Sequence, residues 1–174
     1  PEFGSQVIVN ESQQAALFAS GNLISLLQPG PHTLETTGLP ILKNFVQDGS
    51  KSFPFEVWFV NKVASTSFNW GTRTPIQIKE KSFGLIVPLS SYGNYECKIN
   101  DIQSFIMQVV GVRNNYAIST LREFLFPLVE RETKDALANL AITEDVFMLT
   151  SRLNEVSETI KKRLEDKFKG YGLA

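Results

Sequence analysis

Residues 83–105 read FGLIVPLSSYGNYECKINDIQSF, and within this stretch the sequence pattern changes from strand to helix. Residues 83–89 and 93–99 predict two β-strands that join near Ser91 and complete a sheet. From Asp101 onward the apolar residues fall at helical spacing, and Asp101 is a residue type that caps the N-terminus of a helix. Strands are therefore expected before this point and helices after it, which predicts an α+β fold with a mainly antiparallel sheet.

A second informative stretch lies near the start, where residues 26–34 read LLQPGPHTL. Pro29 and Pro31 flank Gly30, which excludes a helix and holds the chain in a tight reversal. We assign Pro29, Gly30 and His32 to a structural turn. His32 is expected to hydrogen-bond the backbone of that turn rather than to act in chemistry.

The first part of the chain carries further strand signals. Residues 7–9 and 15–19 are short apolar runs on either side of a polar turn, and they predict a hairpin. Gly21 and Asn22 mark a second turn. Residues 53–60, FPFEVWFV, predict a strand, with residues 63–70 as its partner in a hairpin.

This aromatic segment is the candidate interaction surface of the sequence. By alternation, Phe53, Phe55, Val57 and Phe59 share one face of the strand and Trp58 faces the other. A strand that is apolar on both faces is either covered twice or offers a binding surface. The outward residues of the proposed hairpin would then contact a partner or a lipid interface, with these members: Phe53, Phe55, Trp58, Phe59 and Trp70.

Two long helices are expected in the second part. Thr120 and Glu123 form a capping-box pattern that starts a helix running to about Leu140, and Pro127 predicts a kink or a false start within it. Thr143 is expected to cap a short turn that follows. The last helix begins near Ser151 and carries one apolar stripe that packs in the core or on a neighbouring protomer: Leu153, Val156, Ile160, Leu164 and Phe168. Gly170 is expected to end it.

Composition limits the function classes. The 174 residues suffice for one domain with a full core, and the net charge of −1 argues against a nucleic-acid binder. A single cysteine excludes an intramolecular disulfide and fits a reducing, cytosolic setting. No stretch approaches the roughly 20 apolar residues of a membrane helix. Residues 1–5, PEFGS, have the look of a cloning scar, and residues 6–172 are interpreted as a single domain that stops before its next strand.

Enzyme chemistry has little support in the residue types present. With one histidine and one cysteine, a zinc site is not expected, and neither a cofactor nor a small-molecule substrate is predicted. A hydrolase that uses Cys97 with His32 is a remote alternative, because Cys97 lies in an alternating strand where a buried structural thiol is the ordinary finding. No phosphate-loop, dinucleotide-binding or serine-hydrolase motif occurs.

Taken together, these segments resemble the SPFH (stomatin, prohibitin, flotillin, or band 7) domain. LLQPGPHTL resembles the Pro-Gly-x-His turn that closes the family's opening hairpin, and GNYECKINDIQSFI resembles its strand-to-helix step, without the family's proline after Asp101. The two helical stretches resemble the family's paired helices. The long insertion at residues 53–84 is similar to the bacterial branch labelled virion-core-protein-like.

The resemblance implies a non-enzymatic scaffold at the cytoplasmic face of a membrane. Such a domain forms homo-oligomers and recruits or organises membrane-protein partners, and it binds no nucleic acid. A different class of function also stays open, namely a soluble module that captures a protein or peptide strand at an exposed sheet edge.

Overall fold

The computed structural model describes residues 1, 4–35, 37, 39, 40, 42, 55–62, 65–111 and 116–174. Strands occupy the first part of the chain and helices the second, which confirms the predicted α+β class. The chain divides into two compact units. The first comprises Pro1–Ala64 with Lys98–Gln103, and the second comprises Ser65–Cys97 with Ser104–Ala174.

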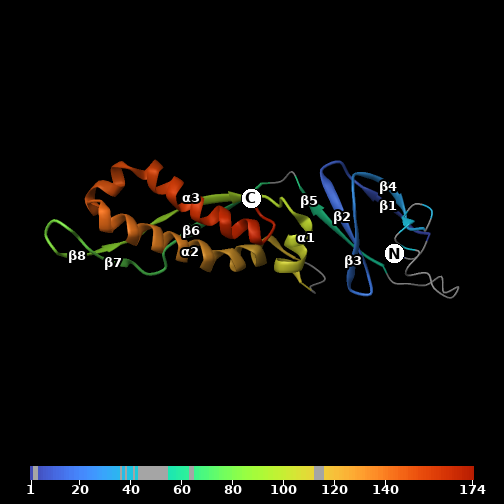
Figure 1. Cartoon of the computed structure of the whole chain (residues 1–174), viewed down its shortest axis with the longest axis horizontal. Helices are drawn as coiled ribbons and strands as arrows, with labels where there is room; N and C mark the ends of the chain where they lie inside the picture. The colour runs from blue at the N-terminus through green and yellow to red at the C-terminus, as the bar shows by residue number, and fades with distance from the viewer. Residues whose placement is uncertain are drawn as a thin grey trace. The chain divides into compact units, whose positions relative to one another are not determined.

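In the described residues of the first unit the strands are antiparallel (Figure 1): β1 (Gln6–Val9), β2 (Gln13–Ala19), β3 (Asn22–Leu27), β4 (Gly30–Thr33) and β5 (Phe55–Asn61). β1 pairs with β4, and β2 lies between β3 and β5 in a three-stranded sheet. The predicted hairpin between residues 7–9 and 15–19 is therefore wrong, because those strands pair elsewhere. The reversal at Pro29 and Gly30 likewise closes no hairpin, since it links β3 to β4 and each pairs with a different strand.

β2 is the central strand of this unit, and its burial follows from that position. Ala15, Ala16 and Leu17 are completely buried. The β2–β3 hairpin turns at Ser20 and Gly21, which both have positive φ, as the tight two-residue hairpin turn requires. The core collects side chains from several strands and the chain after β4: Val7, Val9, Ala15, Leu17, Ala19, Ile24, Leu27, Leu34, Leu42 and Phe55.

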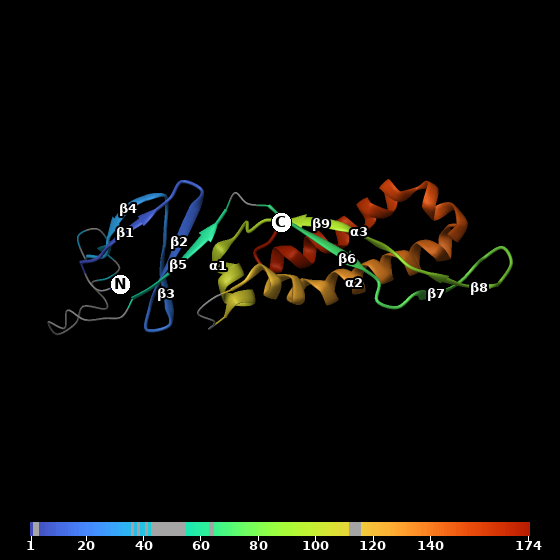
Figure 2. The ribbon, with the colours of Figure 1, turned by 180° about the vertical axis from the view of Figure 1, so that it is seen from behind.

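The second unit contains a long two-stranded ribbon (Figure 2): β6 (Thr66–Gly71), β7 (Ile76–Lys79), β8 (Ile86–Leu89) and β9 (Tyr92–Cys97). β7 pairs with β8, and this hairpin is nested inside the pair β6–β9. Thr72 and Ser91 hydrogen-bond across the ribbon where its two halves meet. Residues 83–89 and 93–99 were predicted to pair with each other, and this is wrong because each returns to an earlier strand.

The aromatic hairpin of residues 53–70 is also not formed. β5 pairs with β2 in the first unit, whereas β6 pairs with β9 in the second. The two segments are neighbours in sequence, but they belong to different units. The prediction failed because it assumed that consecutive strands pair, which is a tendency with many exceptions.

The chain passes into its helical part through α1 (Ile102–Phe105) and the π-helix η2 (Ile106–Val110). The Asp101 carboxylate accepts the backbone N–H of Gln103 at 3.0 Å, as expected of a cap. Gly111, with φ of 61°, ends η2 and donates its N–H to the carbonyl of Ile106.

α2 (Ile118–Thr143) then runs past Pro127 without interruption. It begins two residues before the predicted capping box, and its N-cap is Ala117, which makes no side-chain hydrogen bond. Pro127 is exposed, so water can bond the carbonyl that the missing N–H would have paired. The short turn after α2 is the 3₁₀-helix η3 (Val146–Ser151). Its cap is the Asp145 carboxylate, which accepts the N–H of Phe147, and not Thr143.

α3 (Leu153–Gly170) lies alongside α2 in both views (Figures 1 and 2). Val156, Leu164 and Phe168 of the predicted stripe are buried, but Leu153 is exposed. Gly170 is the last residue of the helix and Tyr171 is its C-cap, but the left-handed glycine that closes the helix is Gly172. Gly172 has φ of 72°, and the N–H groups of Gly172 and Leu173 donate to the carbonyls of Lys169 and Phe168, which is the Schellman arrangement.

Candidate functional site

The predicted aromatic surface is largely taken into the core. Phe55 is 3% exposed and belongs to the core of the first unit, so its assignment to an interaction surface is wrong. Its side chain lies on the same face of the sheet as Ala15 and Leu17 of β2, which are buried in the same core. Phe53 lies outside the described residues.

Two aromatic residues of β5 retain exposure toward the end of the strand. Phe59 is 50% exposed and pairs with Ala15, and Trp58 is half-buried opposite Ala16. Because the small alanine side chains give an aromatic ring little to pack against on its flank, Phe59 keeps one face open. β5 is also an edge strand of the three-stranded sheet.

Trp70 lies on β6 of the second unit and contributes to a different environment. It is half-buried over Gly93 of β9, where an added Cβ would come within 3.3 Å of the indole Nε1. The five predicted residues therefore do not form one patch in one sheet, and Phe59 is the one among the four described members that is mostly open.

A more exposed apolar feature lies in the second unit, in the turn that joins β7 to β8. Phe83 is 76% exposed, Leu85 62% and Ile86 69%. Sequence reasoning assigned residues 83–89 to one strand and missed the turn. The signal that could have revealed it is the run Lys-Glu-Lys-Ser ahead of Gly84, which interrupts the alternation with turn-forming residues.

Glu80 organises this turn from within. Its residue is only 1% exposed, and its carboxylate accepts the backbone N–H groups of Ser82 and Phe83, both at 2.6 Å. The hydrogen bond from Ser82 is the main cause that holds the pKa of Glu80 below its ordinary value. Glu80 also donates its own N–H to the carbonyl of Leu85, and Gly84, with φ of 68°, donates to the carbonyl of Glu80.

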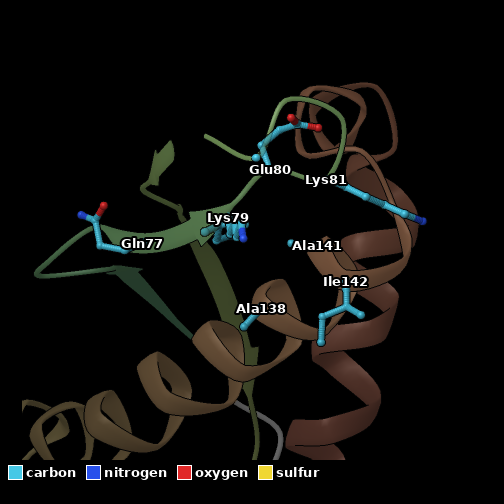
Figure 3. A pocket seen from close by; sticks show the side chains of 9 residues that line it. Gln77, Lys79, Glu80, Lys81, Ala138, Ala141 and Ile142 are labelled. Atoms are coloured by element: carbon cyan, nitrogen blue, oxygen red, sulfur yellow. The ribbon is translucent and has the colours of Figure 1, made fainter. Parts of the chain in front are cut away.

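A pocket of about 500 Å³ opens beside the turn (Figure 3). Residues 77–81 of β7 and the turn after it form one side with Gly84, and Ala138, Ala141 and Ile142 of α2 form the other. The small alanine side chains leave this space. Lys79 and Lys81 are both exposed at its rim, so the cations of the turn are available to solvent.

The base of the ribbon is tied to α2 by polar contacts. Glu130 accepts the backbone N–H of Arg73 at 2.9 Å and pairs with Lys134 at 3.0 Å. These contacts lower the pKa of Glu130, chiefly through the Arg73 hydrogen bond. The Arg73 guanidinium lies 4.4 Å from the ring centre of Phe126, in cation–π geometry. The ribbon is therefore held on its helix, and its turn projects from a fixed base.

The residues of the remote hydrolase alternative are placed as ordinary structural groups. Cys97 is buried, and burial raises the pKa of its thiol to about 11, which leaves little thiolate for nucleophilic attack. His32 Nε2 lies 2.6 Å from the carbonyl oxygen of Gln28, within its own turn. The two residues belong to different units.

In the part of the chain that the structure describes, no group of three or more His, Cys, Asp or Glu side chains is placed to hold a metal ion. None of the described helices has the length and apolar character needed to cross a membrane.

The comparison with known families identifies the fold. The profile described as "SPFH domain-Band 7 family" matches residues 2–174. The chain belongs to this family. Its members are known for membrane-associated scaffolding, are generally non-enzymatic, and typically oligomerise and associate with membranes and proteins.

Among curated proteins, the chain is similar to YdjI of Bacillus subtilis (strain 168), a protein described as uncharacterized. The two are 28% identical over 144 residues, which is 76% of this chain and 44% of YdjI. The chain thus spans less than half of the relative it matches.

Proposed function

We propose that this chain is a non-enzymatic scaffold domain that works at the cytoplasmic face of a membrane, self-assembles, and recruits partner membrane proteins. The observation that carries the proposal is the family match across residues 2–174. The narrower placement in the virion-core-protein-like branch remains a prediction from the sequence.

Within this proposal, the open end of β5 is the partner-binding surface. Phe59 presents an apolar ring at a sheet edge, with Trp58 half-buried beside it. Aromatic side chains of this kind supply much of the binding energy of protein interfaces. Phe55 has no part in this surface, because it is buried in the core.

Recruitment in cells tests the proposal. A fluorescent fusion of the full-length protein is expected to gather at the membrane, and Phe59→Asp is expected to disperse it. The exposed Glu56 on the same strand offers a matched control, and Glu56→Ala should leave recruitment unchanged. Recruitment that is equal in Phe59→Asp and the wild type would remove β5 from the proposal, and a wild type that stays dispersed would contradict the membrane role itself.

Self-assembly is tested separately. Light scattering on the purified full-length protein is expected to give a mass well above that of one chain. A monomer at all concentrations would contradict the scaffold as stated.

A second candidate function is favoured by the edge position of β5. An extended peptide could add to this edge as a further strand, with Phe59 beside it. Peptides selected for binding should then protect the β5 amides from hydrogen exchange. Selected peptides that protect only amides outside β5 would exclude this candidate.

A further inference from the structure

We propose that the β7–β8 turn dips into the headgroup region of an anionic phospholipid membrane, with Phe83 and Leu85 entering the interface and Lys79 and Lys81 contacting lipid phosphates. The inference deepens the proposed membrane role by naming a contact that neither the family match nor the β5 surface assigns.

The first observation is the exposure of the apolar side chains. Phe83, Leu85 and Ile86 stand within four residues and are each more than 60% exposed. Single exposed apolar residues are ordinary on a protein surface, but a group at the tip of a projecting turn marks an interaction site.

The second observation is that four backbone N–H groups of the turn are paired within it. The N–H groups of Glu80, Ser82, Phe83 and Gly84 all donate within residues 80–85. Backbone N–H groups that are already paired approach the apolar edge of a bilayer at lower cost, because the hydrocarbon layer offers them no partners. A protein partner could supply such bonds itself, so this feature favours lipid over protein.

The third observation is charge. Lys79 and Lys81 are exposed on either side of Glu80, whose carboxylate is turned inward to the amides of Ser82 and Phe83. The outward-facing charges of residues 79–86 are therefore both positive, and they complement an anionic membrane surface.

The contact is confined to the turn. The corner between α2 and η3 also exposes Phe147 and Met148, but Glu144 and Asp145 precede them. Glu144 pairs with Arg152 and Asp145 accepts the N–H of Phe147, and residues 143–151 contain neither lysine nor arginine, so this corner lacks the exposed lysines that would complement anionic headgroups. It supplies the matched control.

Co-flotation of the full-length protein with vesicles tests the proposal. The probes are phosphatidylcholine vesicles and vesicles with about one-third phosphatidylglycerol, whose surface potential attracts lysines. Phe83→Ser with Leu85→Ser is expected to lower partitioning into the anionic vesicles at least about tenfold. Phe147→Ser with Met148→Ser, which removes similar apolar area without changing charge, should leave it unchanged.

The lysines are tested in the same assay. Lys79→Gln with Lys81→Gln is expected to lower partitioning into the anionic vesicles about 30-fold and to leave binding to phosphatidylcholine unchanged, because each lysine near an anionic surface contributes about fivefold. Equal loss on both vesicle types would contradict the charge contribution.

A dye on the turn tests the membrane contact in a protein that keeps Phe83, Leu85 and both lysines, so the result does not depend on whether the substituted variants fold. Ser82→Cys can carry an environment-sensitive dye, since the buried Cys97 reacts slowly. Its emission should shift to the blue on anionic vesicles. No shift, unchanged flotation of the Phe83→Ser, Leu85→Ser variant, or absence of wild-type binding would each overturn the proposal.

Two outcomes separate this proposal from its alternatives. Loss of large assemblies in the Phe83→Ser, Leu85→Ser variant, with vesicle binding unchanged, would assign the turn to contacts between copies and overturn the lipid role. Wild-type protein that ignores vesicles but gathers at the membrane in cells would overturn the turn proposal and support recruitment through a partner protein.

Discussion

The strand β5 and the β7–β8 turn both contain apolar residues, but they differ in how far these side chains are buried. β5 is conspicuous in the sequence, yet Phe55 and Val60 are buried and Trp58 is half-buried. The turn contains one aromatic residue, and it leaves Phe83 and its apolar neighbours open. The density of aromatic residues along a chain therefore does not locate an exposed surface.

Pairing explains the difference. β5 pairs with the buried central strand β2, so some of its apolar side chains, such as Phe55, pack in the core of the first unit. The turn lies at the end of a ribbon, where β7 contributes Ile78 to a core, and the exposed residues Phe83 and Leu85 lie in the turn between β7 and β8. Four predictions test this contrast.

The largest effect is expected at Phe55, the buried first residue of β5. Phe55→Ala should lower the free energy of unfolding by about 3–5 kcal/mol, because it leaves a cavity in a packed core. Phe59→Ala, on the same strand, should change it by less than about 1 kcal/mol. In a Trp70→Phe background, the fluorescence of Trp58 reports urea unfolding of the first unit. Equal losses in the two variants would contradict the difference in burial between Phe55 and Phe59.

Cys97 gives a second measure of burial, in the second unit. Its pKa of about 11 means that alkylation by iodoacetamide at pH 8 should be about 200-fold slower in the folded protein than in urea, because far less thiolate is present. Mass spectrometry over time follows the reaction. Comparable rates in both states would show that the thiol is accessible and ionised.

The turn should respond to acid through Glu80. Its pKa is lowered in the folded state, so its contribution to turn stability is present above the ordinary glutamate pKa and is lost as pH falls through the lowered value. The amide NMR signals of Ser82 and Phe83 should titrate below the midpoint of a free glutamate peptide. Glu80→Gln should abolish the titration. A midpoint at or above the peptide value would contradict the inward-facing carboxylate.

The smallest effect is expected from the tip itself. Phe83→Ala and Leu85→Ala should each change the free energy of unfolding by less than about 0.5 kcal/mol, since exposed side chains contribute little packing. Thermal unfolding by circular dichroism suffices. A loss that approaches that of Phe55→Ala would mean that these side chains are packed rather than presented.

Local signals in the sequence predicted the elements that depend on neighbours in the chain. Asp101 caps a helix because its carboxylate reaches an N–H two residues away. The sequence predicted the buried stripe of α3, because helical periodicity places Val156 and Phe168 on one face. Gly170 is the last residue of the helix, but the closing hydrogen bonds form around Gly172, which is the glycine with positive φ.

The sequence predicted the exposed surface less well than it predicted the helices. Of the five residues proposed from the aromatic segment, Phe55 is buried and Trp70 lies in the other unit, packed over Gly93. Alternation correctly placed Phe55 and Val57 on a shared face, but it could not say which face a second layer covers.

The sequence alone determined the fold class and the order of strands and helices, because both rest on short-range periodicity, and it indicated the family through the resemblance of its segments to the SPFH domain. Only the tertiary structure decided which strands pair: β1 with β4, β5 with β2, and β7–β8 inside β6–β9. The physical reason is that backbone hydrogen bonds between strands carry almost no residue identity. Partner choice is settled by long-range burial, and that choice determines which apolar side chains remain at the surface.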